Sequence, residues 1–161
     1  MSQLKRVLVA NRGEIAIRIA KAARDLGMEA IGVYTKADEW SLHTRFMSSA
    51  HALQVQPNDT RGPVAAYLDA ATIVAIAVET GCDSIHPGYG FLSESAELAS
   101  LCEQSDLRFV GPVVQALEVF GDKSRALKLA QSLSIPTVPG SDGLVGNVEE
   151  ALTVAGHSDI R

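Results

Sequence analysis

The first thirty-four residues alternate between short apolar runs and apolar positions at helical spacing. The run "RVLVA" (Arg6–Ala10) predicts a buried strand. After "NRGE", apolar residues recur every three or four positions as far as Leu26, and Gly27 predicts the end of that helix. The run "EAIGVY" (Glu29–Tyr34) predicts the next strand. A strand, helix and strand within about 30 residues are typical of a right-handed parallel crossover.

The same alternation continues toward the middle of the chain. It predicts a third strand in "HALQV", a long apolar helix from Pro63 through Glu79 that ends at Gly81, a fourth strand in "DSIH", a helix over Ser95–Ser105, and a fifth strand in "LRFVG". Strands that alternate with helices in this way predict an α/β fold with a doubly wound, Rossmann-like parallel sheet.

The pattern changes near residue 120, where we expect a domain boundary. The first domain would comprise residues 1–119 and the second residues 120–161. The second begins with a short helix after Asp122, continues through a loop rich in Gly, Ser and Asp, and contains one more predicted helix over Val148–Ala155.

Composition narrows the class of protein. The 161 residues are 47% hydrophobic and 20% charged, as expected for a compact globular chain. A net charge of −5 argues against nucleic-acid binding, and the longest apolar run is far shorter than the roughly 20 residues that cross a bilayer. We therefore expect a cytoplasmic protein, in which Cys82 and Cys102 are reduced, buried thiols. The four histidines lack metal-ligand spacing.

The loop "ANRGEIAIR" invites comparison with a dinucleotide-binding site. That fingerprint requires three glycines, whereas only Gly13 is present, and Glu14 places a carboxylate where a phosphate would approach the helix. Asp38, near the end of the second strand, does not outweigh these objections. The alternative is a well-capped turn with Arg12 in solvent.

The loop "HPGYGFLSE" predicts a sharp, rigid turn after the fourth strand. Gly88 and Gly90 permit left-handed backbone angles, and Ser93 or Ser95 is a candidate N-cap. Tyr89 would then lie beside bare backbone at the carboxyl edge of the sheet, where a flat polar ligand has access to amide groups. A purely structural turn with Tyr89 packed on Phe91 is the alternative.

The segment "GDKSRALKLA" predicts a helix whose first turn is basic. Asp122 is a good N-cap, but Lys123 and Arg125 oppose the helix dipole. A bound anion, most commonly phosphate, would satisfy both cations and the free backbone amides. Two solvated basic residues are the alternative.

Taken together, these motifs resemble the N-terminal part of biotin carboxylase. The segments "VANRGEIAIRI", "IHPGYGFLSE", "FVGP", "GDK" and "PTVPGSDG" follow one another in the family's order from Val7 to Gly143. The resemblance implies a pre-ATP-grasp domain followed by the beginning of an ATP-grasp domain. It also implies a ligase that uses ATP and bicarbonate, with magnesium or manganese, to carboxylate biotin on a carrier domain.

The resemblance assigns roles to six residues. Lys123 matches the family's ATP-binding lysine, and Tyr89 with Gly90 matches the biotin pocket. Arg18, Lys21 and Asp25 match the helix of a two-fold dimer contact, and they share one predicted helical face. The implied partners are a biotin carboxyl carrier domain, a carboxyltransferase and a second copy of the chain.

The family's metal, bicarbonate and general-base residues would lie beyond Arg161. We therefore expect a truncated fragment that holds no catalytic or metal-ligating residue and is inactive alone. Two alternatives stay open, namely a related ATP-grasp carboxylase that acts on urea or a guanidine compound, and a non-catalytic dimerisation module. The acyl acceptor cannot be predicted, because its choice resides in the carboxyltransferase.

Overall fold

The computed structural model describes residues 3–54, 62–138 and 145–157. The chain forms two compact units, residues 1–117 and 118–161.

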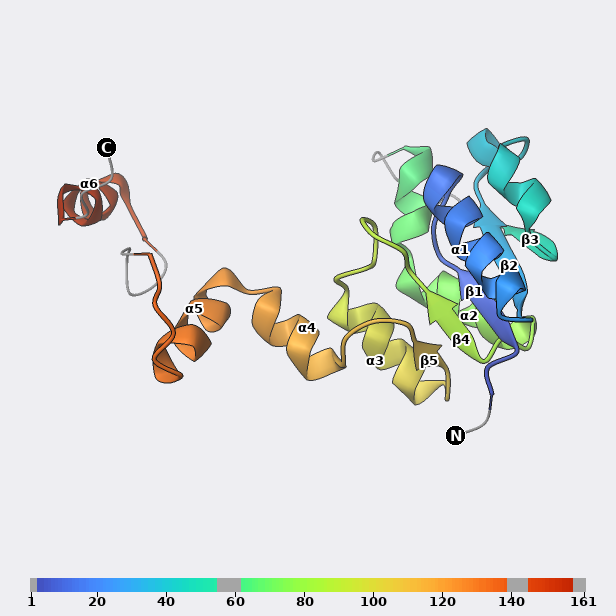
Figure 1. Cartoon of the computed structure of the whole chain (residues 1–161). Coiled ribbons are helices and arrows are strands. Elements are labelled where there is room, and N and C mark those ends of the chain that lie inside the picture. The colour runs from blue at the N-terminus through green and yellow to red at the C-terminus, as the bar shows by residue number, and fades with distance from the viewer. Residues whose placement is uncertain (1–2, 55–61, 139–144, 158–161) are drawn as a thin grey trace. The chain divides into compact units, whose positions relative to one another are not determined.

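The first unit is built on a five-stranded parallel sheet (Figure 1). Its strands are β1 (Arg6–Val9), β2 (Glu29–Tyr34), β3 (Ser49–Ala52), β4 (Ser84–His86) and β5 (Arg108–Phe109). Their order in the sheet is β3-β2-β1-β4-β5, so the chain builds outward from β1 first in one direction and then in the other. This order confirms the predicted doubly wound α/β fold.

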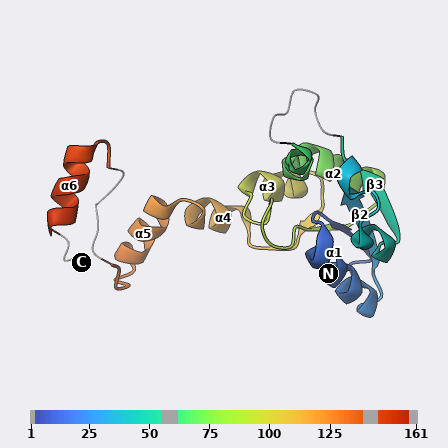
Figure 2. The same ribbon diagram turned by 90° about the horizontal axis from the view of Figure 1, so that it is seen from above.

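Helices cover both faces of the sheet, as Figure 2 shows from above. The helical segments of the first unit are α1 (Gly13–Asp25), η1 (Lys36–Asp38), η2 (Leu42–Phe46), η3 (Pro63–Leu68), α2 (Ala70–Glu79) and α3 (Ala96–Gln104), and α4 (Val114–Phe120) begins in the first unit and ends in the second. Val7 and Val9 pack toward α1 and η2, whereas Leu8 and Ala10 pack toward η3, α2 and α3. Successive side chains of β1 thus enter two cores, which explains why the strand is apolar throughout.

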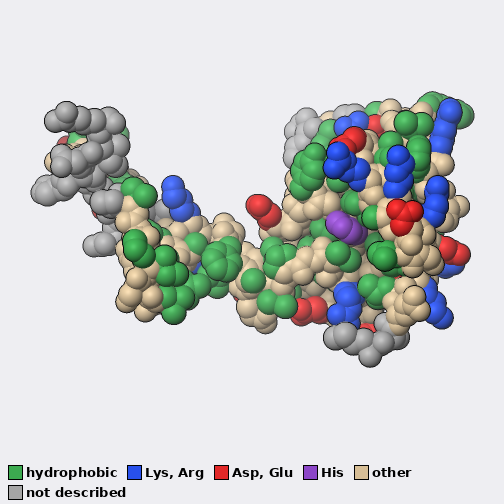
Figure 3. All heavy atoms as spheres, viewed as in Figure 1, with side chains coloured by type: hydrophobic (Ala, Val, Ile, Leu, Met, Phe, Trp, Pro, Cys, Tyr) green, Lys and Arg blue, Asp and Glu red, His purple; other side chains and the backbone are tan. Residues whose placement is uncertain are grey.

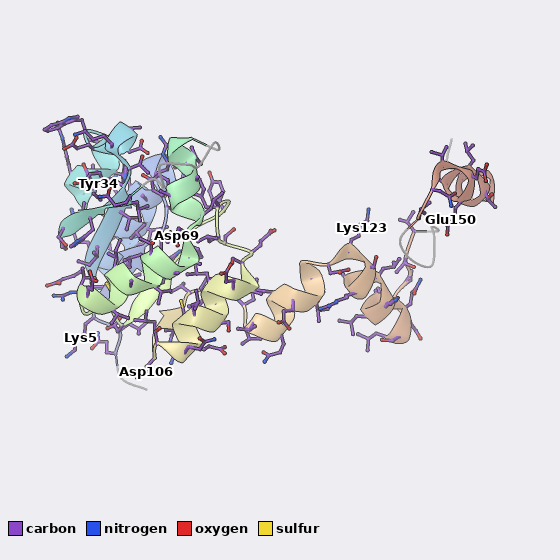
Figure 4. All side chains as sticks on the ribbon, turned by 180° about the vertical axis from the view of Figure 1, so that it is seen from behind. Lys5, Tyr34, Asp69, Asp106, Lys123 and Glu150 are labelled. Carbon is purple, nitrogen blue, oxygen red and sulfur yellow. The ribbon has the colours of Figure 1, made fainter. Side chains whose placement is uncertain are left out.

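The long helix expected over residues 63–79 is in fact two helices. A 3₁₀ segment, η3, ends at Leu68, and α2 begins at Ala70. Asp69 separates them, because its carboxylate accepts hydrogen bonds from the Thr72 backbone N–H at 3.0 Å and from the Thr72 hydroxyl at 2.7 Å. An N-cap of this kind starts a new helix in spite of the continuous apolar sequence around it. Figure 4 shows Asp69 at this junction.

Two strands and one helix differ from the sequence prediction. β3 begins at Ser49, earlier than the expected strand, whose last residue Val55 lies outside the described residues. β5 is only two residues long, although the Val110 N–H still donates to the Ile85 carbonyl of β4 at 2.9 Å before the Gly111-Pro112 pair. Helix α4 was not predicted at all.

The second unit contains α5 (Lys123–Ser132) and α6 (Val148–His157). The predicted Gly, Ser and Asp-rich loop lies at residues 139–144, outside the described part of the chain. Every residue of α5 is described, and none of its side chains is buried. Several large hydrophobic side chains of this unit are exposed, among them those of Phe120, Leu133, Val138, Val148 and Leu152. Within the described ranges, no helix has the length and apolar character needed to cross a membrane.

Candidate functional site

The candidate site lies at the carboxyl ends of β1 and β4, which are neighbours in the sheet. Val9 is paired with His86 at the last position of this ladder, and the Ala10 amide donates to the His86 carbonyl at 3.0 Å. The loop after β1 therefore lies directly beside the loop after β4. Parallel α/β sheets bind their ligands at this edge.

Asn11 fastens the two loops together. Its side chain is completely buried, and its amide nitrogen donates to the carbonyl oxygens of Pro87 at 2.7 Å and of Tyr89 at 3.0 Å. Its side-chain oxygen accepts a hydrogen bond from the Arg12 backbone N–H at 2.8 Å. One asparagine thus satisfies three backbone groups of two loops that are more than seventy residues apart in sequence.

Only glycine fits at position 88, for two reasons: the backbone angle is left-handed, and no space is left for a side chain. Its φ is +72°, in the left-handed region that glycine favours. A Cβ atom at this position would lie 2.7 Å from Ile15 Cγ2 and 2.8 Å from Asn11 Nδ2, closer than van der Waals contact allows. Gly90 also has a left-handed φ of +69°, but nothing lies within 4 Å of the corresponding Cβ position. Both left-handed angles were predicted from the sequence and are confirmed.

The turn presents Tyr89 to solvent, with 67% of the residue exposed. Phe91 does not pack on Tyr89, as the structural alternative required. Its ring instead stacks on Tyr67, with centroids 5.3 Å apart and planes inclined by 23°. Of the two candidate N-caps, Ser93 and Ser95, it is Ser95 whose hydroxyl accepts from the Leu98 N–H at 3.1 Å and begins α3. The turn is therefore fixed at both ends while its aromatic residue stays free.

His86 supports the same turn from within. Its Nδ1 accepts a hydrogen bond from the Gly88 N–H at 3.0 Å, which places the proton of the neutral ring on Nε2. Burial lowers the pKa of His86 below 6.5, so the ring is neutral at physiological pH.

Arg12 is exposed, as expected, but its guanidinium is not free, because it forms a two-pronged ion pair with Asp38. Its Nε and Nη2 lie 2.7 and 2.6 Å from the two carboxylate oxygens. The Tyr67 hydroxyl donates to Asp38 at 3.0 Å and the Ser41 hydroxyl at 3.1 Å. The Arg12 hydrogen bonds, more than any other contact, lower the pKa of Asp38 from 3.8 to about 2. The N-terminus of α1 has no side-chain cap, so the expectation of a well-capped turn was wrong.

This network explains why the β1 loop is a poor dinucleotide site. Asp38 follows β2, where a dinucleotide-binding protein would place an acidic group for the ribose. Here both of its oxygens already accept hydrogen bonds from protein groups, and the residue is only 5% exposed. The Asp38 carboxylate is therefore occupied by hydrogen bonds within the protein and is not free to bind a ribose.

Lys123 is the first residue of α5, in the second unit. Asp122 caps that helix as predicted, because its carboxylate accepts from the Arg125 N–H at 2.9 Å. The Lys123 side chain is exposed and projects from the ribbon in Figure 4. Among the described residues it has no ion-pair partner, whereas the Arg125 guanidinium lies 3.9 Å from Asp122. A helix start with a free cation and unused backbone amides has the chemistry of an anion site.

The predicted dimer residues lie exposed on α1. Arg18 pairs with Glu14 one turn earlier, and the Lys21 ammonium lies 5.3 Å from the centre of the Phe46 ring. Asp25, the last residue of the helix, is also exposed. Figure 3 shows hydrophobic side chains between the charged ones on the face of the molecule that carries α1. An apolar groove of about 480 Å³ beside α1 is lined in part by Arg18 and Leu26.

Asn11 and Tyr67 were missed by the sequence analysis. The signal for Asn11 was a lone amide between a fully apolar strand and a helix, at the carboxyl edge of the sheet. Tyr67 lies in a stretch that looks uniformly apolar, and its role depends on Asp38 and Phe91, which are distant in sequence. Cys82 and Cys102 are free and buried, as expected.

The biotin carboxylase N-terminal domain family model matches residues 3–117. The chain belongs to this family. It is 42% identical over 151 residues to the small subunit of 2-oxoglutarate carboxylase from Hydrogenobacter thermophilus. This alignment covers 94% of the chain and 31% of that protein. It is 44% identical over 155 residues to biotin carboxylase 1 of Bacillus subtilis, with coverage of 94% and 33%.

Solved biotin carboxylases have the same fold. The biotin carboxylase domain dimer of Hydrogenobacter thermophilus 2-oxoglutarate carboxylase, in complex with MgADP, ADP and bicarbonate, superposes with a TM-score of 0.88 at 40% identity. This alignment covers 97% of the chain and 33% of that domain. A complex of Campylobacter jejuni biotin carboxylase with an ATP analogue gives a TM-score of 0.86 at 35% identity, with coverage of 96% and 33%. The chain thus spans about a third of the length of these biotin carboxylase relatives.

Proposed function

We propose that this chain supplies the N-terminal part of an enzyme that carboxylates biotin with ATP and bicarbonate. The observation that carries the proposal is the turn at Tyr89 and Gly90, open to solvent at the ligand-binding edge of a biotin carboxylase N-terminal domain. In the reaction, bicarbonate attacks the γ-phosphoryl group of ATP, which forms carboxyphosphate and ADP. Carboxyphosphate then breaks down to carbon dioxide and phosphate, and the carbon dioxide bonds to N1 of the biotin ring as N1 gives up its proton to the released phosphate.

The chain would contribute binding surfaces to this reaction. Tyr89 and the bare backbone at Gly90 would line the pocket for the ureido ring, since a flat polar ring can approach a glycine closely. Lys123 would bind the ATP phosphates through a charge-assisted hydrogen bond, which its lack of a described carboxylate partner supports. ATP thus fits the residues present, and its phosphates would provide the electrophile for bicarbonate.

The metal would be held elsewhere. Within the described residues, no three Asp, Glu, His or Cys side chains are grouped as metal ligands. Magnesium or manganese would therefore bind through the ATP phosphates and residues outside this chain, as the family pattern implies. The exposed hydrophobic side chains of the second unit support the same arrangement, because the helices of an ATP-grasp domain would pack against further chain.

The partners of the proposed enzyme are a biotin carboxyl carrier domain, a carboxyltransferase and a second copy of the chain. The Hydrogenobacter domain is a dimer, and we propose that Arg18, Lys21 and Asp25 on α1 form the corresponding two-fold contact here. Their exposure on a single helix supports this assignment.

A chimera provides the direct test. Residues 1–161 would replace the matching third of Bacillus subtilis biotin carboxylase 1, and ATP hydrolysis would be followed with and without bicarbonate and free biotin. We expect hydrolysis that requires both. A chimera that unfolds cooperatively yet shows no such hydrolysis, while the unaltered Bacillus enzyme does, would refute the proposal.

The same chimera tests Lys123. Replacement of Lys123 by alanine removes one charge-assisted contact of about 1.5 to 3 kcal/mol, so the affinity for ATP should fall by a factor of about 10 to 100. Lys128→Ala is the matched control, because Lys128 is an exposed lysine of the same helix, more than one turn further along. Equal affinities of the two variants for ATP would reject the phosphate role of Lys123.

A further inference from the structure

We infer that Asn11 is a positioning residue for the biotin pocket, which it shapes by holding the Pro87–Gly90 turn from below. The inference rests on the proposed function. Asn11 lies on the β1 loop and is completely buried, so it does not touch the ligand side of the turn. Its effect on biotin would therefore be exerted through the backbone that carries Tyr89.

Three contacts define the action of Asn11. Its two donor bonds, to the carbonyls of Pro87 and Tyr89, fix the peptide group that precedes Gly88 and the one that follows Tyr89. The bond from the Arg12 N–H to its side-chain oxygen orients the amide so that both hydrogens face the turn. The amide can make these bonds only because Gly88 lacks a Cβ atom, which would lie 2.8 Å from the amide nitrogen. The asparagine and the glycine are therefore fitted to each other.

The turn has a second support on its far side. Phe91, with a left-handed φ of +45°, stacks on Tyr67, which in turn donates to Asp38. This support fixes the exit of the turn, and His86 Nδ1 accepts from the Gly88 N–H, but neither contact binds the carbonyls of Pro87 and Tyr89. Loss of the Asn11 amide leaves those two carbonyls without their partner and lets the segment that bears Tyr89 move, while α3 and the sheet stay in place. The predicted consequence is specific to the ligand that Tyr89 contacts.

The test compares Michaelis constants in the chimera described above. Asn11→Ala should raise the KM for biotin by about tenfold, since loss of the donors to two buried carbonyls costs on the order of one tenfold step in binding. The KM for ATP should stay within about a factor of two, because the described hydrogen bonds of the Asn11 side chain are all with residues of the first unit. Asn11→Ser keeps one donor instead of two, and it provides a milder variant with the same expected direction if the alanine variant fails to fold.

A matched control separates positioning from general loss of stability. Asp69→Ala removes the N-cap of α2 and destabilises the same domain, but the described side-chain hydrogen bonds of Asp69 are with Thr72 and not with the turn. This variant should leave the KM for biotin unchanged. A rise in the KM for biotin in the control as well, or an equal rise in both Michaelis constants for Asn11→Ala, would overturn the inference. So would unchanged constants in both Asn11 variants.

A second readout does not depend on turnover. In the chimera without ligands, amide hydrogen exchange of residues 88–91 should be faster in Asn11→Ala than in the unmodified protein, while exchange in β1 and α3 stays the same. Unchanged exchange at the turn would refute the positioning role. A chimera that is inactive but shows the faster exchange would refute the proposed function and leave the contact between Asn11 and the turn established.

Discussion

Replacement of Asp38 by asparagine should remove a pH-dependent part of the stability of the first unit. The Asp38 carboxylate accepts two hydrogen bonds from Arg12 and one each from Tyr67 and Ser41. Asparagine has the same shape but no charge, and its side-chain oxygen can accept one of the two Arg12 hydrogen bonds whereas its NH2 group cannot accept the other. The variant should therefore fold, with a weakened link between the β1 loop and the Tyr67 ring.

The magnitude follows from the pKa of Asp38. A fall of this pKa from 3.8 to about 2 corresponds to about 2.4 kcal/mol of stability at neutral pH. The carboxylate side chain is only 7% exposed, but the Arg12 side chain is 43% exposed, so solvent screens part of the attraction. We therefore expect about 1.5 to 2 kcal/mol.

The sign is set by the direction of the shift. Because the folded pKa lies below the unfolded one, this stability is present above pH 4 or so and is lost as the pH falls from about 4 through about 2. The assay is urea unfolding of the 161-residue chain between pH 2 and pH 7. The difference between the wild type and Asp38→Asn should shrink to near zero at pH 2. Asp25→Asn is the control for net charge, since Asp25 is exposed on α1. Parallel pH curves for the wild type and Asp38→Asn would refute this reasoning.

Three further predictions concern the turn, the histidines and the isolated chain. Gly88→Ala should lower the free energy of unfolding by about 2 to 4 kcal/mol, because alanine would adopt a left-handed backbone angle and would also clash with its neighbours. Gly90→Ala imposes only the unfavourable backbone angle and should lower it by about 1 to 2 kcal/mol. Equal losses of the two variants in urea unfolding would contradict the steric argument. Burial lowers the pKa of both His43 and His86 below 6.5. The free energy of unfolding should therefore be greatest above pH 6.5 and should decrease as the pH falls from 6.5 toward the lower pKa values of the folded state. A free energy of unfolding that stays constant from pH 5 to 7.5 would contradict this prediction. The 161-residue chain alone should show no bicarbonate-dependent ATP hydrolysis, and turnover above a blank in a phosphate-release assay would disprove this.

Local signals predicted the elements wherever they agreed with the tertiary structure. β2 has the predicted bounds, because its apolar run begins just after the left-handed Gly27 that ends the preceding helix. The prediction failed at Asp69, where one capping residue divides an apolar stretch that looks continuous. It failed again at α4, because a helix of seven residues has too few turns for apolar periodicity to stand out. Apolar periodicity locates buried segments, but a single polar side chain decides where a helix begins.

The candidate site was predicted in its composition but not in its connections. The left-handed glycines, the Ser95 cap and the Asp122 cap follow from the preferences of single residues, and all were confirmed. The Arg12 ion pair and the Asn11 bonds were not predictable in this way. Each joins loops that become neighbours only when β1, β2 and β4 align in the order that the sheet adopts.

The arrangement of these contacts accounts for an exposed aromatic residue on a rigid turn. An exposed tyrosine side chain buries little apolar surface that could hold it in place, so its position must be fixed by the backbone on either side of it. Asn11 fixes the carbonyls of Pro87 and Tyr89, and Phe91, two residues after Tyr89, stacks on Tyr67. The ordering entropy of the turn is thus lost during folding and not when a ligand binds. A mobile turn with the same sequence would bind the same ring more weakly, which is why we expect Asn11 to be detected through the KM for biotin.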